Sequence, residues 1–406
     1  MRILVTSQNY WPDNFLITEI AEELVKKGHQ VTVLTGLPDY STNKIPKKYK
    51  FGRNRHEKHN GVEIIRVPII ARHHGFIFRV LNYLSFFISS SIYARVHRFK
   101  NIDVIYSWQT APVLMINPAI ILKKKLKKPL MIYVLDIWPD QMKVWNIYEN
   151  NLLYKLIHRY CKKAYGSGDI VGVTSLPFIE YLKNICEVDE KKMIYLPQHS
   201  AKLEIKDTNH IENSLVNFIF AGNIGQQQNV ECLIKAISLM KTKKNFVVNI
   251  YGDGTSLEKC KKYTKDLKME NRIIFHGRVN KEKLNNIYPK MDAFLLTLRP
   301  EKEIGFVANT IPAKLQGYMS GGKPILASID GGAKQIINES KCGAVVPAGD
   351  AIGYATILDD FVENRDKYKL CGKNAIDYFN KNFEKKIVMD KLENILIELS
   401  KKEGMK

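Results

Sequence analysis

The feature of this sequence that most constrains its fold is a repeated alternation of short apolar runs with segments of helical periodicity. The first apolar run, residues 1–8, is followed by residues 15–30, in which apolar side chains recur at helical spacing and Gly28 stands where a C-terminal helix cap belongs. A second apolar run, residues 31–36, comes next. The order strand, helix, strand predicts an α/β fold with a parallel, doubly wound sheet.

The alternation continues along the chain in two series. The first series has further apolar runs at residues 62–70, 103–108, 130–138, 169–175 and 193–197. The second series has runs at residues 216–225, 245–254, 271–279, 292–300, 323–328 and 342–350. Because 406 residues exceed what one ordinary core accommodates, we predict two Rossmann-like domains in tandem.

The domain boundaries follow from the polar segment between the two series, residues 198–213, which is the natural linker. We place the first domain at residues 1–198 and the second at residues 199–383. A last helix, residues 384–402, has apolar side chains at helical spacing. We expect this helix to pack back on the first domain.

The chain is strongly basic, with a net charge of +21. Residues 1–198 hold 29 Lys and Arg against 16 Asp and Glu, and the remainder holds 33 against 25. A basic surface favours negatively charged partners, which include nucleic acid, diphosphates and anionic lipid. The alternative is that a Lys-, Ile- and Asn-rich composition alone produces this charge.

Cysteine usage gives no sign of a metal site or of a disulfide framework. The six cysteines are scattered, without a Cys-x-x-Cys pair or a Cys/His cluster. This usage fits a reducing cytosol. The first residues run straight into an apolar strand without a cleavable signal pattern, so we expect a cytoplasmic protein.

One segment, residues 75–99, is aromatic and apolar with flanking basic side chains. Its uncharged core, residues 80–94, is shorter than the roughly 20 residues that span a bilayer. Two interpretations stay open: an ordinary buried helix of the first domain, or an apolar face with a cationic rim that lies on a membrane surface. The basic run at residues 123–128 lies nearby in sequence, although most such runs are solvated faces.

Four motifs together resemble one protein family. They are the stretch at residues 8–40, DIWPD at residues 136–140, AGNIG at residues 221–225, and IPAKLQGYMSGGKPILASIDGG at residues 311–332. They are similar to the family-4 retaining glycosyltransferases of GT-B fold and, within these, to the WbuB/WcaI-like branch. Members of that branch are regarded as N-acetyl-L-fucosaminyl transferases of surface-polysaccharide assembly. The resemblance covers essentially the whole chain.

The resemblance implies two Rossmann-like domains that face each other across a cleft. The C-terminal domain would hold a nucleotide sugar and the N-terminal domain the acceptor. Transfer would retain the anomeric configuration, and it would need neither a metal ion nor a cofactor.

The segment GNIGQQQNV, residues 222–230, follows an apolar run and precedes a helical one. Gly222 and Gly225 would let backbone N–H groups approach a phosphate beside a helix N-terminus. Family-4 enzymes often carry Arg and Lys here, five residues apart, and the matching positions in this chain are Asn223 and Gln228. Both side chains are neutral, and an ordinary strand–helix turn is the alternative.

The family's usual pair of glutamates is also absent. In the wider family one Glu binds the ribose and a second lies near the donor sugar, eight residues earlier. The matching positions are Gly317 and Asn309. Two cations and two anions are thus lost together, which leaves no unpaired buried charge.

Other side chains then have to meet the diphosphate. Arg299 ends an apolar run, where open α/β sheets bind ligands, and Lys314 lies in the first turn of a helix that starts near Pro312. A cation is unfavourable at a helix N-terminus unless an anion binds there. We predict that Arg299 and Lys314 replace the usual Arg/Lys pair, unless Lys314 is a plain surface residue.

Two neutral side chains and one more cation complete the predicted donor site. Asn309 and Gln316 would supply hydrogen bonds to ribose or sugar hydroxyls. The segment FHGRV, residues 275–279, resembles the family segment that meets the nucleobase, so Arg278 would stack on the base. A simple strand-end turn is the alternative for this segment.

On the acceptor side the resemblance points to DIWPD. Asp136 is the first candidate for a catalytic or sugar-positioning carboxylate and Asp140 is the second, because a carboxylate can bind hydroxyls or accept a proton. Helix capping is the alternative role for Asp136. Trp11, Asp13 and Asn14, in the loop after the first apolar run, would line the same acceptor site.

We therefore predict a hexosyl- or hexosaminyltransferase of O-antigen or capsule biosynthesis. It would move a sugar such as N-acetyl-L-fucosamine from a UDP-sugar to a polyprenyl-diphosphate-linked glycan, peripherally at the inner face of the cell membrane. The alternatives are a UDP-sugar 2-epimerase of similar architecture and a non-catalytic partner subunit. A nucleic-acid-binding protein is disfavoured because no nucleic-acid motif appears.

Overall fold

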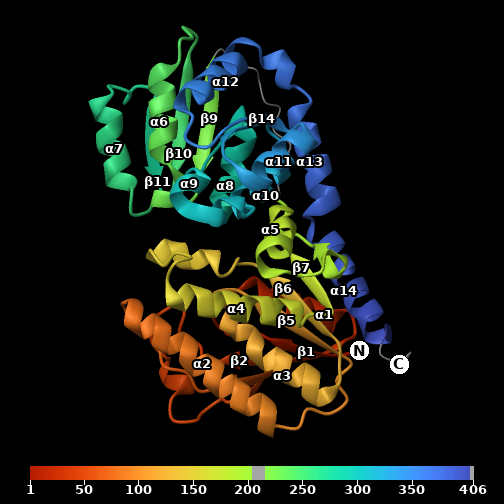
Figure 1. Ribbon diagram of the computed structural model, residues 1–406. Coiled ribbons are helices and arrows are strands. Elements are labelled where there is room, and N and C mark those ends of the chain that lie inside the picture. The colour runs from red at the N-terminus through yellow and green to blue at the C-terminus, as the bar shows by residue number, and fades with distance from the viewer. Residues whose placement is uncertain (204–214, 403–406) are drawn as a thin grey trace. The chain divides into compact units, whose positions relative to one another are not determined.

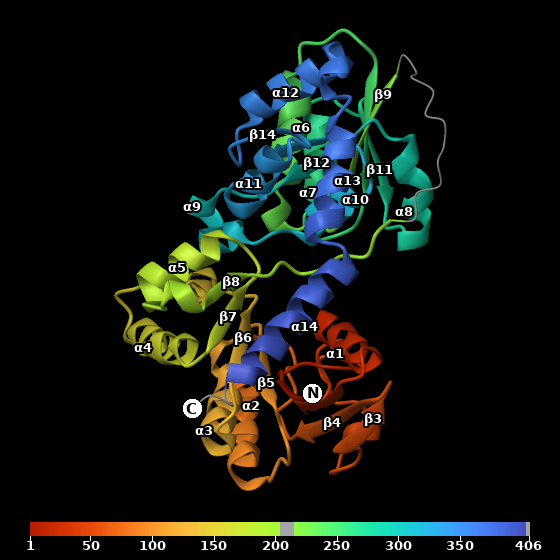
Figure 2. The same ribbon diagram turned by 90° about the vertical axis from the view of Figure 1, so that its right-hand side faces the viewer.

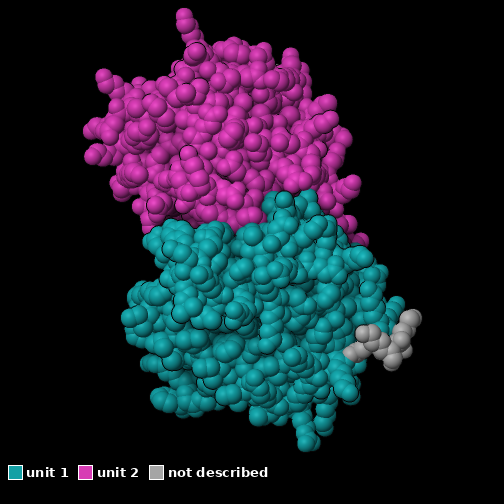
Figure 3. Space-filling view, viewed as in Figure 1, with its two compact units in different colours: residues 1–196, 389–406 teal, residues 197–388 magenta. Residues whose placement is uncertain are grey.

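Both predicted series of apolar runs form sheets in the computed structural model, which describes residues 1–203 and 215–402. The chain divides into two units: residues 1–196 with 389–406 form unit 1, and residues 197–388 form unit 2 (Figure 3). Most of the predicted linker, residues 204–213, lies outside the described residues.

The sheet of unit 1 has eight strands in the order β3-β4-β2-β1-β5-β6-β7-β8. All neighbouring strands are parallel except β3 and β4, which form an antiparallel hairpin. The strands are β1 (Arg2–Thr6), β2 (Gln30–Gly36), β3 (His56–His59), β4 (Val62–Val67), β5 (Val104–Gln109), β6 (Leu130–Val134), β7 (Ile170–Val173) and β8 (Met193–Tyr195). Strands β1, β5 and β6 are almost entirely buried, as expected for a parallel sheet covered on both faces.

Helices cover both faces of this sheet (Figures 1 and 2). On one face lie α1 (Leu16–Lys26) and α14 (Lys385–Lys401). On the other lie α2 (Phe76–Val96), α3 (Asn117–Leu126) and α4 (Leu152–Gly166). The remaining helices of unit 1 are α5 (Pro177–Cys186), η1 (Lys47–Tyr49), η2 (Val113–Ile116), η3 (Asp140–Trp145) and η4 (Glu190–Lys192).

The last helix, α14, packs on unit 1 through ion pairs near its middle. Lys27 Nζ lies 2.5 Å from Asp390 Oδ1 and 2.9 Å from Glu393 Oε2. His29 Nε2 lies 2.8 Å from Glu393 Oε1. These contacts join the C-terminal segment to the loop between α1 and β2, so unit 1 is built from both ends of the chain.

The sheet of unit 2 has six parallel strands in the order β11-β10-β9-β12-β13-β14. The strands are β9 (Val216–Ala221), β10 (Phe246–Tyr251), β11 (Ile273–Gly277), β12 (Ala293–Thr297), β13 (Ile325–Ser328) and β14 (Gly343–Val346). Alternate side chains of β9 enter different cores: Phe218 and Phe220 join one, Ile219 and Ala221 the other.

Each core is closed by its own set of helices. The first contains side chains of α6 (Val230–Leu239), α7 (Leu257–Asp266) and α12 (Ala351–Glu363). The second contains or contacts side chains of α8 (Lys281–Ile287), η6 (Tyr288–Lys290), α10 (Ala313–Ser320), α11 (Gly331–Ser340) and α13 (Cys371–Asn382). Four short helices complete the unit: η5 (Gln226–Gln228), α9 (Glu301–Ile304), η7 (Gly305–Asn309) and η8 (Arg365–Tyr368).

The two sheets share one strand order. The run β4-β2-β1-β5-β6-β7 in unit 1 corresponds to β11-β10-β9-β12-β13-β14 in unit 2. This is the order of doubly wound dinucleotide-binding sheets, in which the direction of winding reverses beside the first strand. Ligands of such sheets bind beyond the carboxyl ends of the strands, so the loops after β9 and β1 lie where a ligand would bind.

Candidate active site

Glycine loops after β9 and β10 form the base of the site in unit 2. The N–H of Gly222 donates to the Tyr251 carbonyl at 2.8 Å, and the N–H of Ile224 donates to the Asp253 carbonyl at 2.8 Å. A Cβ atom on Gly252 would lie 1.9 Å from the Gly222 carbonyl oxygen, and Gly252 has a φ of +155°. Only glycine permits this approach, which brings the two loops together.

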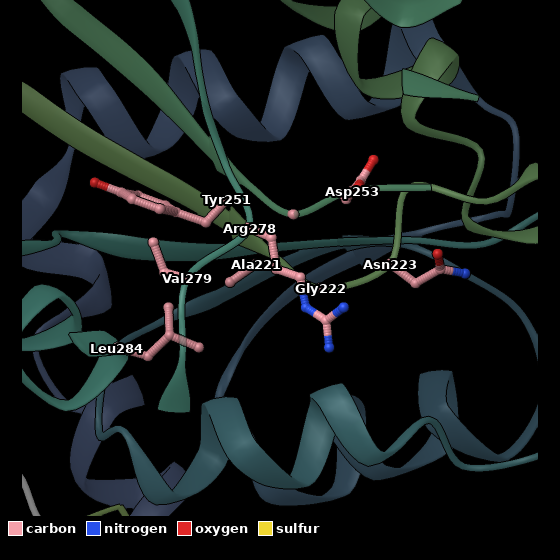
Figure 4. Close-up of a pocket in the computed structure, with 9 residues that line it drawn as sticks. Ala221, Gly222, Asn223, Tyr251, Asp253, Arg278, Val279 and Leu284 are labelled. Atoms are coloured by element: carbon pink, nitrogen blue, oxygen red, sulfur yellow. The ribbon is translucent and has the colours of Figure 1, made fainter. Parts of the chain in front are cut away.

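A cavity of about 390 Å³ opens beside these loops (Figure 4). In the close-up, the Tyr251, Val279 and Leu284 side chains gather on one side and the polar ends of Asn223 and Asp253 lie on the other. The guanidinium group of Arg278 lies between these two groups and points away from Tyr251. The full lining is Ala221, Gly222, Asn223, Tyr251, Gly252, Asp253, Arg278, Val279 and Leu284. One end of the cavity therefore suits an aromatic base and the other a polar group.

Lys314, at the start of α10, lies directly over the glycine loop. A Cβ atom on Gly222 would come within 2.7 Å of Lys314 Cε, so a glycine makes room for this side chain. Lys314 Nζ donates to Gln228 Oε1 at 2.9 Å and lies 3.7 Å from the ring centroid of Phe220. Burial lowers the pKa of Lys314 to about 7. An anion at Gly222 would favour the charged form of this amine.

Lys314 and Gln228, both predicted as donor-site residues, thus lie in contact. No carboxylate hydrogen-bonds or ion-pairs with Lys314 among the described residues. The two backbone N–H groups of Asn223 and Gly225 also donate to no described protein group. Two unused donors and a cation without a counter-ion are the arrangement that a phosphate group binds.

Arg299 lies just after β12, where the sequence analysis placed it, and its side chain and backbone are engaged by protein groups. Its Nε donates to the Gln226 carbonyl at 2.7 Å, its backbone N–H donates to the Gln227 carbonyl at 2.9 Å, and its Nη1 lies 2.7 Å from Glu303 Oε2. Thr297 Oγ1 donates to the Gln228 carbonyl at 2.6 Å. The end of β12 therefore anchors η5 by three successive carbonyls, and Arg299 positions the loop.

The two predicted neutral donors lie in packed surroundings. Asn309 is buried in η7, where a Cβ atom on Gly331 would lie 2.5 Å from its Oδ1 atom. Gln316 is buried in α10 and its Nε2 donates to the Gln198 carbonyl at 2.8 Å. A Cβ atom on Gly317 would meet nothing within 4 Å, so the position of the family's ribose Glu is open space. The roles of Asn309 and Gln316 toward a sugar stay predictions.

Six residues of the cavity were missed by the sequence analysis. They are Ala221, Tyr251, Gly252, Asp253, Val279 and Leu284. Tyr251 stacks on His276 with ring centroids 4.2 Å apart, and His276 in turn contacts Asn249 Oδ1 at 2.8 Å. The glycine pair around Asp253 was the available signal, because a Gly-Asp-Gly turn at a strand end places its carboxylate at the ligand edge.

The corresponding edge of unit 1 is built from carboxylates. Asp13, in the loop after β1, is buried and accepts four hydrogen bonds from the loop after β2. The donors are the backbone N–H groups of Asp39, Tyr40 and Ser41 and the Ser41 hydroxyl, at 2.6 to 3.1 Å. Asp13 therefore fixes one loop against another, and both of its oxygens are occupied.

Asp39 extends this polar cluster to helix α2. Its Oδ2 atom accepts from the Arg72 backbone N–H at 2.7 Å and from Asn82 Nδ2 at 2.9 Å, and Asn82 Oδ1 accepts from Gln8 Nε2 at 2.8 Å. Burial raises the pKa of Asp39 to about 6. Asp39 was not among the predicted residues, since its loop carries no repeated pattern.

Asp136 follows β6 and is held at the same edge. The Ala111 backbone N–H donates to its carboxylate, and its carbonyl accepts from Gln109 Nε2 at 3.1 Å. Burial raises the pKa of Asp136, against the effect of the Ala111 hydrogen bond. It lies near Tyr83, whose pKa is raised by burial and, more weakly, by the Asp136 charge. A carboxylate with a raised pKa is suited to accept a proton from a hydroxyl.

Asp140, the second predicted carboxylate, lies in a different environment. It is buried at the start of η3, and Lys143 Nζ lies 2.6 Å from its Oδ1 atom and 2.7 Å from Glu149 Oε1. The ion pair with Lys143 occupies Asp140 Oδ1, so this carboxylate is less available to an acceptor hydroxyl than that of Asp136. This geometry favours a structural role for Asp140.

Trp11 and Asn14 complete the predicted acceptor residues. The Trp11 ring stacks on His59 with centroids 3.9 Å apart, and its carbonyl accepts from Arg66 Nη2 at 2.7 Å. Trp11 is therefore held against the β3–β4 hairpin. Asn14 is exposed. In the described residues, no group of three or more His, Cys, Asp or Glu side chains is arranged to hold a metal ion.

Helix α2 forms most of residues 75–99, the segment for which the sequence left two interpretations open. One side of it packs on the sheet through Asn82, Tyr83, Phe86 and Ala94, whereas Ile77, Leu81, Leu84, Ile88 and Ile92 are exposed along the other. Among the described helices, α2 alone is long and apolar enough to cross a membrane by length and composition, with 28% of its most apolar window buried. The helix is thus neither fully buried nor separate from the sheet.

Both halves of the chain match families of sugar-transfer enzymes. Residues 15–198 match the family described as Glycosyltransferase Family 4, and residues 202–378 match Glycosyl transferases group 1. The Probable glycosyltransferase WbjE of Pseudomonas aeruginosa is 25% identical over 278 residues, which cover 66% of this chain and 68% of that protein. The Lipopolysaccharide 1,6-galactosyltransferase of Escherichia coli is 30% identical over 156 residues, 37% of this chain and 41% of that protein.

A solved structure extends the likeness to the whole fold. The structure of Anabaena Alr3699/HepE in complex with UDP matches with a TM-score of 0.69 and 14% identity, and the match covers 98% of this chain and 99% of that one. At this identity the match bears on the fold. The two Rossmann-like units and the two family matches together show that the chain is a glycosyltransferase of GT-B fold, with a family 4 domain followed by a group 1 domain.

Proposed function

We propose that this glycosyltransferase moves a sugar from a UDP-sugar to a lipid-linked glycan in surface-polysaccharide biosynthesis, with retention of anomeric configuration. The relatives support the pathway class, since one is named a lipopolysaccharide galactosyltransferase. The structural neighbour with bound UDP supports the nucleotide. The resemblance to the WbuB/WcaI-like branch supports an N-acetylated deoxyhexosamine such as N-acetyl-L-fucosamine as the sugar.

The main support for the proposed donor site is the contact of Lys314 with the glycine loop of Gly222. The amine lies where a diphosphate would approach the free N–H groups of Asn223 and Gly225. Arg278, which is exposed, lines the cavity that opens beside this glycine loop. Lys314 and Arg278 would thus replace the family's Arg and Lys, while Tyr251, Val279 and Leu284 would pack against the base.

The chemistry follows from the charge that develops during transfer. As the bond between the sugar and the diphosphate breaks, negative charge grows on the leaving phosphate, and cations held beside it lower the barrier. The acceptor hydroxyl loses its proton, and Asp136 in unit 1 is the candidate group to bind or accept it. This proposal requires no metal ion.

The acceptor would be a polyprenyl-diphosphate-linked glycan at the inner face of the cell membrane. The exposed apolar side of α2 supports a position at a membrane surface. The net charge of +21 supports an anionic surface as the partner.

The test is calorimetric titration of the purified chain with UDP, GDP, ADP and dTDP in the presence of EDTA. We expect selective binding of UDP, weakened about 10- to 100-fold by Lys314→Ala, because a hydrogen bond to a charged group contributes about 1.5–3 kcal/mol. Lys265→Ala, which removes an exposed cation from α7, is the matched control and should leave the affinity unchanged.

The same preparation separates the alternatives. Transfer predicts that UDP is released from a UDP-sugar only when an acceptor is added. A 2-epimerase would convert a UDP-sugar without an acceptor. Absence of binding by all four nucleotides would instead support a non-catalytic partner subunit.

A further inference from the structure

A second cavity, of about 480 Å³, lies on unit 1 between the helices α2, α3 and α4. The described residues that line it include Arg95, Lys124, Lys125 and Lys163, and none of them is acidic. Asn117 and Tyr160 line it as well: Tyr160 Oη donates to Asn117 Oδ1 at 3.3 Å, and Asn117 Nδ2 donates to Ser91 Oγ at 2.7 Å. This cavity belongs to neither of the sheet edges described above.

Three cations of this cavity lack counter-ions. Arg95, Lys124 and Lys163 are exposed and make no ion pair with any described residue. Lys125 differs from these three, since its Nζ contacts the carbonyls of Arg95 and His97 at 2.5 and 2.7 Å. These carbonyls lie at the C-terminal, negative end of α2. Because Lys125 caps them, their partial negative charge no longer opposes the binding of an anion in the cavity.

The charge extends over all three helices. Helices α2, α3 and α4 together carry nine Lys and Arg and no Asp or Glu. On α4, Lys155, Arg159 and Lys163 are exposed at spacings of four residues and form one line that ends at the cavity. Helix α1, on the opposite face of the sheet, differs because it carries Glu19, Glu22 and Glu23 against one lysine. The face formed by α2, α3 and α4 is therefore strongly basic.

Apolar side chains are exposed on the same helices. Ile77, Leu81, Leu84, Ile88 and Ile92 form a stripe at helical spacing along α2, and Val96 continues it to the residue after Arg95. On α4, Leu152, Leu153 and Leu156 are exposed beside the basic line. Nucleic acid would suit the cations and not the leucines and isoleucines, whereas a lipid leaflet suits both.

We propose that the cavity between α2, α3 and α4 binds the phosphate headgroup of an anionic phospholipid, while the exposed stripe of α2 lies at the acyl boundary of the same leaflet. The headgroup phosphate accepts hydrogen bonds from Arg95, Lys124 and Lys163. This site would fix how unit 1 sits on the membrane, at a place separate from its sheet edge. The inference deepens the membrane position in the proposed function and does not depend on the identity of the donor.

The experiment is co-sedimentation of the full chain with vesicles of phosphatidylcholine alone and of phosphatidylcholine with 30% phosphatidylglycerol. We expect binding to the anionic vesicles only. The variant Lys124→Gln/Lys163→Gln should bind about 30-fold more weakly, at about fivefold for each surface cation. The matched variant Lys50→Gln/Lys58→Gln removes two exposed lysines elsewhere on unit 1 and should lose less than about threefold.

Three results would overturn the headgroup site. The first is an equal loss in both double variants, which would mean that net charge alone attracts the chain. The second is binding of glycerol phosphate in solution without vesicle binding, which would mean a soluble phosphate ester. The third is binding to duplex RNA that depends on Lys124 and Lys163. UDP titration of the same variants keeps the two proposals apart, because the donor cavity lies in unit 2.

Discussion

The two sheets of this enzyme share a strand order and differ in what their loops place at the carboxyl edge. In unit 2 the loops after β9 and β10 are glycine turns, and the nearest charged side chains include Lys314 and Arg278. In unit 1 the corresponding loops after β1 and β2 carry Asp13 and Asp39, and Asp136 follows β6 at the same edge. The edge of unit 2 leaves backbone N–H groups and cations open beside one carboxylate, Asp253. The carboxylates of unit 1 instead accept hydrogen bonds that hold its loops together.

This difference fits what each of the two proposed substrates offers. A diphosphate is an anion that needs donors and cations, and glycine lets the backbone itself approach it. A sugar acceptor offers hydroxyl groups, which carboxylates bind well. Under the proposed function the same topology would serve two ligands, because the chemistry resides in the loops and the sheet only positions them.

The largest effect is expected for Asp13→Ala, which tests whether this carboxylate of unit 1 stabilises the fold. Asp13→Ala would leave three backbone N–H groups and a hydroxyl without their shared acceptor. We expect the free energy of unfolding to fall by about 3–5 kcal/mol, as for a broken buried network. Urea denaturation of the variant and of the neighbouring Asn14→Ala, whose side chain is exposed, measures the difference. Equal stability of the two variants would contradict the structural role.

Substitution of Asp136 should differ from substitution of Asp13, because it should change the rate of transfer more than the stability of the fold. Asp136→Asn keeps the size of the side chain and removes its ability to take a proton. We expect the rate of transfer to fall about 100-fold, the lower range for a general base, with UDP affinity unchanged. Asp140→Asn should instead mainly reduce stability, because it breaks the pair with Lys143. Steady-state kinetics with both variants decides, and a larger rate loss for Asp140→Asn would reverse the assignment.

Lys314 of unit 2 should make the affinity for the donor depend on pH. With the pKa of Lys314 near 7, the amine of Lys314 in the free enzyme is protonated at pH 6 and largely neutral at pH 8.5. A bound diphosphate favours the charged amine and raises its pKa, so binding takes up a proton above pH 7. The affinity for UDP-glucose, whose phosphates do not titrate in this range, should fall as pH rises, by up to about tenfold per pH unit.

Lys314→Arg is the control for this dependence. An arginine stays charged across the range, so the titration of this variant should be flat between pH 6 and 8.5. Wild-type affinity that is equally flat would show that Lys314 is protonated throughout or lies away from the phosphates.

The parts of the structure that follow from pattern were predictable, and those that depend on one side chain's partner were not. Apolar runs predicted every strand except β3, whose sequence HEKH is polar because it lies at the sheet edge. Lys314 was predicted as a donor-site residue because a cation at a helix start is locally unfavourable. The structure brings it into contact with Gln228, and its role toward a ligand stays a prediction. The anchoring role of Arg299 was not predicted, because its acceptors are backbone carbonyls of η5, which carry no sequence signal.

The smallest effect concerns Gly317, the position where the family carries its ribose carboxylate. It lies inside helix α10, and a Cβ atom there would meet no neighbour within 4 Å. Gly317→Ala should therefore raise the free energy of unfolding by about 0.5–1 kcal/mol, because alanine loses less backbone entropy in a helix. Thermal denaturation of the variant measures the gain, and UDP titration should be unchanged because the added methyl group brings no charge. Loss of UDP binding would mean instead that a ligand occupies this space closely, which would place the ribose beside α10 as in the wider family and extend the donor edge beyond the cavity of Gly222.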